Sequence, residues 1–288
     1  MSTTLPPDIK LGLVKLNVSN LERSIRFYLE IVGLKVLQST STQAELTVDG
    51  IHPFLLLEEI PHAQVTQRRS AAGLYHFAIL LPSRKDLGAS LRNLIQSGIH
   101  IGQADHLVSE ALYITDPDNN GIEIYCDRPR NTWRRDENGN YIMASDPIDW
   151  EGVLKEAEGF EWSGLPVGST MGNIHFHVKN LQKSREFYCD VLGFDVAVDA
   201  SETMKALFIS AGGYHHHIGM NIWAGEEAPS RPSNGTGLEY YTLIFPTEKT
   251  RNEALERLQS VGVQATDLDD VLTVTDPSGI QLRLLFAE

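Results

Sequence analysis

One pattern occurs twice in this chain, and this internal repeat restricts the possible folds more than any other feature. The segment Val18-Ser-Asn-Leu-Glu-Arg-Ser-Ile-Arg-Phe-Tyr28, followed by Gly33, recurs 160 residues later as Val178–Tyr188, followed by Gly193. The Val, Asn, Leu, Ser, Phe, Tyr and Gly positions are identical without a gap. Similarity at a fixed spacing indicates that one supersecondary unit is used more than once.

A second pattern is also duplicated. Gly73-Leu74 opens a segment that ends its helical part at Gly98, and Gly237-Leu238 opens a similar segment that does so at Gly262. Both copies close with a Thr-Asp-Pro turn. The two duplicated patterns together predict four related units in the 288 residues.

Each unit has the same expected order of elements, shown here for the first. A strand is expected over residues 12–18, because apolar residues alternate there. Ser19 and Asn20 can cap a helix over 21–32, which Gly33 would stop. Three strand-like runs follow at 34–38, 43–48 and 54–58. The fold class is therefore α+β, with four βαβββ modules.

The modules divide the chain into two expected domains, residues 9–126 and 170–288, joined by a linker at 127–169. The linker has weak periodicity around Val153 and Leu154, so one short helix is expected in it. Trp133 and Trp150 indicate that the linker lies against the body of the protein.

Composition excludes several classes of partner. With 24 Lys and Arg against 38 Asp and Glu, the formal net charge is −14, which disfavours nucleic acid and anionic membranes as partners. The two cysteines suit a reducing compartment, and no apolar run is long enough to span a membrane. A soluble, cytoplasmic protein is expected, and a homodimer only because symmetric pairs are common.

Residues His106 to Glu123 hold a hairpin with unusual polar residues. A strand is expected over 110–115 and a turn over 116–121, where Pro, Asn and Gly favour tight geometry. In the returning strand Glu123 lies between Ile122 and Ile124, so alternation sends the carboxylate to the face opposite the two isoleucines. A solvated sheet face and a functional site are both compatible with the hairpin alone.

Strand parity places further polar residues on the same kind of face. In the strand expected over 75–81, the apolar residues occupy one face and His76 lies on the opposite face. In the strand expected over 173–178, Asn173, His175 and His177 lie opposite the apolar residues in the same way. If 215–222 is a strand, His215 and His217 join this face and His216 falls under the helix. A histidine on a sheet is usually structural, but several at one parity with a carboxylate favour a metal or acid–base site.

Four βαβββ modules resemble the vicinal oxygen chelate superfamily, which includes glyoxalases, extradiol ring-cleaving dioxygenases and bleomycin-resistance proteins. The resemblance covers all of the chain except the linker and implies two half-barrel domains. The spacing of His106, Tyr113, Asp116-Pro117 and Glu123 is similar to the extradiol dioxygenase motif, with Asn119 where Gly or Pro is usual. Within the superfamily the chain looks most similar to bacterial catechol-2,3-dioxygenase-like proteins.

The resemblance implies roles for particular residues. Glu123 and His76 would be ligands of a two-histidine, one-carboxylate Fe(II) site, and Tyr113 and His106 would be catalytic groups beside it. The usual location is unit four, but Tyr240 and Gln281 occupy the His and Glu positions there. We therefore expect unit two to close a cup with unit three.

Unit three would have to complete the site. The position expected for the third ligand holds Asn173, a poor iron ligand. We therefore assign the third ligand to His175, with His215 or His217 as alternatives. His215 and His217 are also the candidates for the acid–base role.

The expected function is an extradiol dioxygenase that cleaves catechol or a substituted catechol with O₂ at non-haem Fe(II), with Mn or Zn as alternative metals. Two other readings stay open. The same fold supports a glyoxalase-like metal-dependent lyase or isomerase, and it also supports a non-catalytic protein that binds an aromatic compound.

Overall fold

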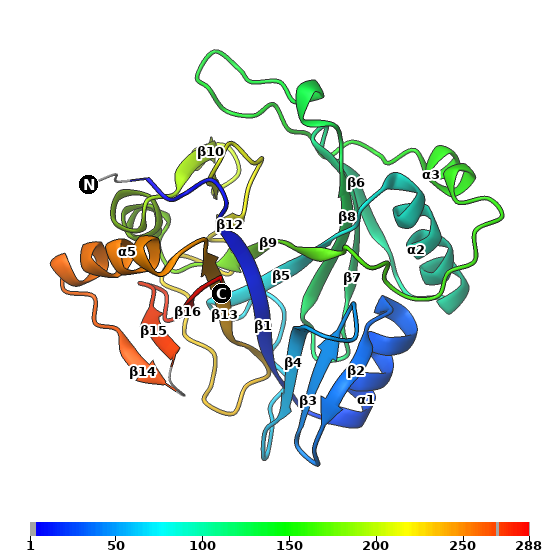
Figure 1. Cartoon of the computed structure of the whole chain (residues 1–288), viewed down its shortest axis with the longest axis horizontal. Helices are drawn as coiled ribbons and strands as arrows, with labels where there is room; N and C mark the ends of the chain where they lie inside the picture. Colours follow the sequence, from blue (N-terminus) through cyan, green and yellow to red (C-terminus); the bar gives the residue numbers. More distant parts are fainter. Residues whose placement is uncertain (1–3, 269–270, 288) are drawn as a thin grey trace.

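The computed structural model describes residues 4–268 and 271–287. It contains the four expected units, each with a strand, a helix and three more strands (Figure 1). Unit one comprises β1 (Lys10–Val18), α1 (Leu21–Phe27), η1 (Tyr28–Val32), β2 (Lys35–Ser39), β3 (Gln43–Thr47) and β4 (Pro53–Glu59). Unit two comprises β5 (Gly73–Leu80), α2 (Arg84–Ser97), β6 (Gly102–Asp105), β7 (Ser109–Thr115) and β8 (Gly121–Asp127).

The second half repeats this order. Unit three comprises β9 (Thr170–His177), α4 (Leu181–Arg185), η3 (Glu186–Leu192), β10 (Asp195–Ala200), β11 (Ala206–Ser210) and β12 (Ile218–Asn221). Unit four comprises β13 (Gly237–Phe245), α5 (Glu248–Ser260), β14 (Thr266–Leu268), β15 (Val271–Thr275) and β16 (Gln281–Phe286). The expected α+β class with glyoxalase-like half-barrels is confirmed.

The units pair across the two halves of the chain. One eight-stranded sheet has the order β14-β15-β16-β13-β1-β4-β3-β2, and the other has the order β10-β11-β12-β9-β5-β8-β7-β6. Unit one therefore pairs with unit four, and unit two pairs with unit three through the antiparallel strands β5 and β9. The expected cup between units two and three is confirmed. The assignment of 9–126 and 170–288 as domains stays a prediction. Each of the two sheets combines one unit from the first half of the chain with one unit from the second half.

The helices begin where the sequence predicts. The Asn20 side chain accepts a hydrogen bond from the Arg23 amide, and Asn180 does the same for Lys183. The first helix of units one and three differs from a regular α-helix, because it widens into a π-helical turn, η1 or η3, before Gly33 or Gly193 ends it. The Gly33 amide reaches the Tyr28 carbonyl at 2.9 Å, which closes this wider turn.

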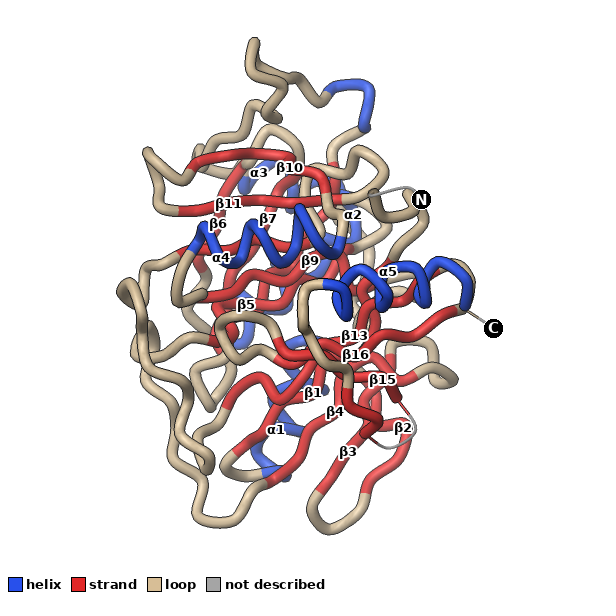
Figure 2. Tube along the Cα trace, turned by 90° about the vertical axis from the view of Figure 1, so that its left-hand side faces the viewer, coloured by secondary structure: helices blue, strands red, loops and turns tan. Residues whose placement is uncertain are grey.

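The linker has the expected short helix, α3 (Trp150–Glu156), and also a 3₁₀ turn, η2 (Arg130–Thr132). Its Trp133 ring contacts Tyr214, so the linker lies against unit three there. Figure 2 shows the same arrangement from the side, with α4 and α5 lying across strands. None of the helices in the described ranges is long and apolar enough to cross a membrane.

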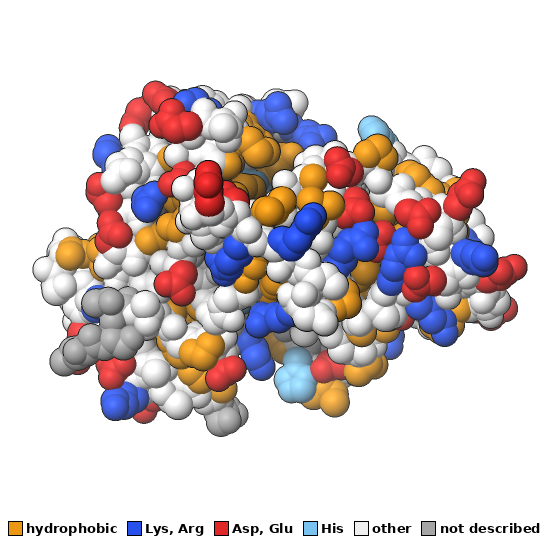
Figure 3. Space-filling model, turned by 90° about the horizontal axis from the view of Figure 1, so that it is seen from above, with side chains coloured by type: hydrophobic (Ala, Val, Ile, Leu, Met, Phe, Trp, Pro, Cys, Tyr) orange, Lys and Arg blue, Asp and Glu red, His pale blue; other side chains and the backbone are white. Residues whose placement is uncertain are grey.

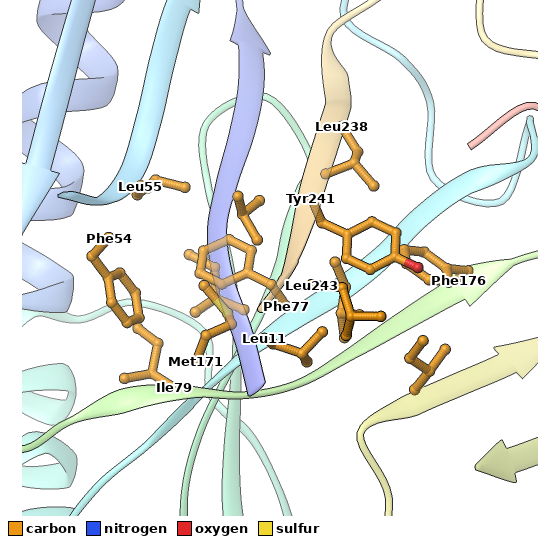
Figure 4. Close-up of a cluster of buried hydrophobic side chains, with 14 of the residues drawn as sticks. Leu11, Phe54, Leu55, Phe77, Ile79, Met171, Phe176, Leu238, Tyr241 and Leu243 are labelled. Atoms are coloured by element: carbon orange, nitrogen blue, oxygen red, sulfur yellow. The ribbon is translucent and has the colours of Figure 1, made fainter. Parts of the chain in front are cut away.

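The surface and the core are clearly separated. On the face in Figure 3, charged side chains of both signs surround hydrophobic side chains near the middle. The core lies between the two sheets, where apolar residues of β5 and β9 meet those of β1, β4 and β13 (Figure 4). The rings of Phe176 and Tyr241, for example, are 5.2 Å apart across this boundary. Because this face of β5 and β9 is taken by the core, their polar residues lie on the opposite, concave face.

Candidate active site

The concave face of the sheet formed by units two and three carries a histidine and a carboxylate side by side. His76 comes from β5 and Glu123 from the adjacent parallel strand β8, where Ala78 is paired with Glu123 and His76 with Gly121. Gly121 leaves room for this pairing, because a β-carbon there would overlap the Tyr75 carbonyl. Nε2 of His76 lies 3.1 Å from Oε2 of Glu123. Both side chains lie on the face that strand parity predicts, and both are buried there.

The contact between His76 and Glu123 has an unusual feature. Nε2 of His76 is buried and has no hydrogen-bond partner, although Glu123 is close to it. Burial by itself would raise the pKa of Glu123, but contact with His76 and the charges of His76 and His106 hold that pKa below its usual value. An ionised carboxylate beside an unsatisfied imidazole nitrogen is a donor set that suits a divalent metal ion.

Tyr113 joins Glu123 to His106. Its hydroxyl lies 3.1 Å from Oε1 of Glu123 and 2.6 Å from Nε2 of His106. Nδ1 of His106 lies 2.6 Å from the Ala144 carbonyl, which can only accept, so Nδ1 carries a proton. Tyr113 has a single proton to give. The Tyr113 hydroxyl can donate this proton to Glu123 only when Nε2 of His106 also carries a proton and donates it to the Tyr113 oxygen. The three residues therefore form a hydrogen-bonded row that ends at Glu123, one of the two metal-ligand candidates.

Burial and the Glu123 charge raise the pKa of Tyr113 well above its usual value, so its hydroxyl stays protonated as a donor.

Unit three contributes an ordered polar cluster to the same face. His175 is paired with His76 across β5 and β9, and the two rings are 5.1 Å apart. Nε2 of His175 accepts a hydrogen bond from Asn221, whose amide oxygen in turn lies 2.6 Å from Nδ1 of His177. Burial, followed by the charges of His76 and His177, lowers the pKa of His175 well below its usual value. His175 is therefore a neutral ring that turns its Nε2 to Asn221, and its part as third metal ligand stays a prediction.

The three consecutive histidines of unit three lie outside β12, so the expectation of a strand over 215–222 is wrong for its first half. His217 turns away, and its Nδ1 accepts from the Ala211 amide at 3.2 Å. His216, expected under the helix, instead contacts Phe208 and lines the cavity. The strand rule fails here because parity applies only where the backbone stays extended.

His215 and His216 are linked to a carboxylate. Nε2 of His215 lies 2.8 Å from Oδ1 of Asp127, and Nδ1 of His215 lies 2.8 Å from Nδ1 of His216. When both rings are neutral, His215 donates to Asp127 and accepts from His216, which leaves Nε2 of His216 without a proton. Burial, followed by the charge of His215, lowers the pKa of His216 well below its usual value and favours this neutral form. The acid–base role expected of His215 and His217 stays a prediction; among the lining residues of the cavity, the histidine of this triplet is His216.

A cavity of about 730 Å³ opens over these residues. Its polar floor holds His76, His106, Tyr113, Glu123 and His175. Its walls are largely apolar or aromatic and include Tyr75, Phe208 and Trp223. A flat aromatic ring with adjacent oxygen atoms matches such a cavity, since apolar walls cover the ring while the floor receives the oxygens.

The linker supplies one wall of the cavity, which the sequence did not reveal. Tyr141 to Ser145 line it, and the Ala144 carbonyl holds His106 in place. Asp105 and Asp146 form backbone bridges that fix this part of the linker to the end of β6. A backbone carbonyl has no sequence signal, so the contact could be found only in three dimensions.

The other sheet does not repeat the site. Tyr240 occupies the position that corresponds to His76, and the guanidinium of Arg283 lies 3.8 Å from the centre of its ring. Lys15 also lies over this ring at 5.7 Å and pairs with Glu58. Cation–π contacts and ion pairs thus fill the concave face formed by units one and four.

Comparison with known proteins agrees with this geometry. The family described as "Glyoxalase/Bleomycin resistance protein/Dioxygenase superfamily" matches residues 10–124 and 170–284. The catechol-2,3-dioxygenase of Bacillus subtilis (strain 168) is 50% identical over 275 residues, which are 96% of each chain. The biphenyl-2,3-diol 1,2-dioxygenase 3 of Rhodococcus globerulus is 29% identical over 39% of this chain and 60% of its own.

Among solved structures, glyoxalase I of Zea mays has a similar fold. Its TM-score is 0.55 at 16% identity, over 97% of this chain and 92% of that one.

Proposed function

The chain belongs to the glyoxalase/bleomycin resistance protein/dioxygenase superfamily, and from this membership and the geometry of the site we propose that it opens the ring of catechol or a substituted catechol with O₂ at a non-haem Fe(II) site. The enzyme class rests on the identity of 50% with a catechol-2,3-dioxygenase over 96% of both chains, which makes this protein an extradiol dioxygenase, an oxidoreductase. The substrate and the metal rest on the arrangement of the concave face.

The observation that carries the proposal is the row from His106 through Tyr113 to Glu123, next to the unsatisfied Nε2 of His76. His76 and Glu123 would hold the ion, together with a third donor from unit three. Fe(II) bound there would supply the activation of O₂ beside a bound catechol, which side chains alone cannot provide. Mn(II) and Zn(II) are the alternative metals, because carboxylate also suits Mn(II) and imidazole also suits Zn(II).

The protein's own residues would bind and orient the substrate. Phe208, Trp223 and Tyr75 cover an aromatic ring, and the apolar surface keeps bulk water from the reacting carbons. Tyr113, which keeps its proton, can donate to a ring oxygen on which negative charge develops. His106 can then return a proton to Tyr113 through the bond of 2.6 Å.

A base is needed for the first catechol proton. His216 lines the cavity in a neutral form and passes its Nδ1 hydrogen bond to His215, which contacts Asp127. Because burial keeps the pKa of His216 low, the proton need not stay on it: as Nε2 of His216 takes up a proton, Nδ1 can pass its own proton to His215, which contacts Asp127. The sequence predicts the acid–base role for His215 or His217. We assign it instead to His216, with His215 as the next residue of the hydrogen-bonded chain.

Reconstitution without oxygen tests the function. The protein is loaded with Fe(II), catechol and then air are added, and oxygen uptake and the yellow ring-fission product are followed. His76→Ala and Glu123→Ala should each abolish uptake, while His52→Ala, in an exposed loop beside Asp49, should not. Iron retained without oxygen uptake would favour a glyoxalase-like lyase, and failure to retain any metal would favour an aromatic-binding protein.

A further inference from the structure

A second buried polar atom near Glu123 lacks a partner. Asn173 on β9 is fully buried, and its Oδ1 accepts no hydrogen bond. Its Nδ2 lies 3.4 Å from Oε2 of Glu123, the same oxygen that Nε2 of His76 approaches at 3.1 Å. One carboxylate oxygen is thus approached by two side chains that each carry an atom without a hydrogen-bond partner. Because buried polar atoms are nearly always paired, these unpaired atoms indicate that both side chains share an electrophile with Glu123 once the Asn173 amide turns its oxygen toward Oε2.

Asn173 and His76 are equivalent positions of two units. Each precedes the cap of its helix by the same interval, His76 before Ser83 and Asn173 before Asn180. Strands β5 and β9 run antiparallel, with Ala78 opposite Asn173 and His76 opposite His175. A local twofold therefore relates His76 to Asn173, and the two side chains approach the axis from opposite strands.

We propose that Asn173 is the third protein ligand of the metal site, binding through its amide oxygen, so that the ion is held by one histidine, one carboxylate and one amide. This inference rests on the metal site of the proposed function. Two donors at right angles on one ion, each about 2.1 Å from it, are about 3 Å apart. The separations of 3.1 and 3.4 Å around Oε2 of Glu123 are close to that value. Half a turn of the amide exchanges its nitrogen and oxygen, so the oxygen can take the place now held by Nδ2.

The neighbouring histidine is already occupied. Oδ1 of Asn221 accepts from the Trp223 amide at 3.0 Å, which fixes the orientation of the Asn221 side chain. Nδ2 of Asn221 then donates to Nε2 of His175 at 2.9 Å. Among the residues that the structure describes, no three His, Cys, Asp or Glu side chains form a group able to hold a metal. Of the unit-three side chains named above, the amide oxygen of Asn173 is the donor that remains beside His76 and Glu123.

This ligand set has a chemical consequence. Imidazole favours Zn(II), Ni(II) and Fe(II), whereas carboxylate, carbonyl and water oxygens favour Mn(II) and Mg(II). Replacing one imidazole by an amide oxygen should therefore reduce the advantage of Zn(II) over Mn(II). The site should bind its ion less tightly than a two-histidine site and discriminate less between these metals.

Mn(II) titration followed by electron paramagnetic resonance of the free ion measures this without any turnover. Asn173→Ala should weaken Mn(II) binding at least tenfold, and Asn173→Asp should bind at least as tightly as the natural protein, because it adds charge to the same donor position. Asn173→His should raise the preference for Zn(II) over Mn(II) at least tenfold. His175→Ala should keep the natural Mn(II) affinity.

The inference is overturned if Asn173→Ala binds Mn(II) as tightly as the natural protein, or if His175→Ala, and not Asn173→Ala, loses the ion. Circular dichroism melting without metal checks that each variant folds. If Asn173→Ala does not fold, an unchanged preference between Zn(II) and Mn(II) in Asn173→His, or weaker Mn(II) binding in Asn173→Asp, would overturn the inference instead. Oxygen uptake is a separate measurement, so metal binding that depends on Asn173 without dioxygenase activity would leave this inference intact and refute the proposed function.

Discussion

The hydroxyl of Tyr28 donates a hydrogen bond of 2.8 Å to Oδ2 of Asp116. This bond joins the first helix of unit one to the turn that leads into Glu123. Oδ1 of Asp116 also accepts from the Asp118 and Asn120 amides, which fixes the turn. The relation recurs in the other half, where Tyr188 donates to Asp276 at 3.1 Å. The duplication therefore preserved a contact between units as well as the elements of each unit.

The buried carboxyl group of Asp276, which contacts Tyr188, should make the stability of the protein depend on pH. Burial raises the pKa of Asp276 to about 6, which is above the value in the unfolded chain. The folded state then holds a proton that the unfolded state has released, so this contribution to stability is present at low pH and is lost as the pH rises from about 4 to about 6.

Asp276→Asn should therefore stabilise the protein at pH 8 by about 1–3 kcal/mol and leave it unchanged near pH 4. Asn still accepts from the Ser278 and Ile280 amides and can donate to the Tyr188 oxygen, while Tyr188 turns its own proton to Tyr241. Urea unfolding at a series of pH values measures the difference. The exposed Asp190→Asn is the control. A variant that is less stable than the natural protein throughout this range would contradict the argument.

The Tyr113 hydroxyl should matter for turnover more than for substrate binding. Tyr113→Phe keeps the ring but removes the donor between His106 and Glu123. At saturating Fe(II) we expect kcat for catechol to fall about 100-fold, with a small change in KM, because the hydrogen bond strengthens as charge develops on the substrate. Tyr241→Phe, whose hydroxyl contacts Tyr188 in the core, should retain the natural kcat. A kcat within threefold of the natural value in Tyr113→Phe would exclude this role.

Strand alternation, which is a local rule, is sufficient to predict the face on which several residues of the site lie. His76, Glu123 and Tyr113 lie on regular strands, where alternation fixes the face of each side chain. The pairing of units two and three followed from the loss of the His and Glu positions at Tyr240 and Gln281. His216 was misplaced because the backbone at 215–217 leaves the strand, and no short-range pattern marks that change. The contact between Ala144 and His106 depends on a long connection whose path is set by tertiary packing.

The histidine triplet offers a comparison within one loop. His216→Gln should lower kcat by about 10²–10⁴-fold, since it removes the neutral imidazole that faces the cavity. His217→Gln should have a much smaller effect on kcat, because its ring holds the Ala211 amide and packs near Phe194 and Tyr214. Single-turnover rates at saturating Fe(II) separate this effect from metal loss. The assignment fails if the order of the two variants is reversed.

Substrate binding should order the linker wall. The Ala144 amide lies 3.4 Å from the His106 carbonyl, a weak bond, and its own carbonyl accepts from the His106 ring. A catechol held against His106 and Tyr141 would restrict both ends of this contact, so hydrogen exchange at residues 142–145 should slow.

The measurement is hydrogen exchange with Fe(II) and catechol in the absence of oxygen, so that no turnover occurs. The exposed residues 158–159, which lie in the same linker and away from the cavity lining, should exchange at their original rate and serve as the internal control. His106→Ala should abolish the slowing at Ala144 while calorimetry still detects some catechol binding, because the wall would then lack its anchor in unit two. Equal slowing with and without the His106 ring would mean that the linker responds to the ligand directly.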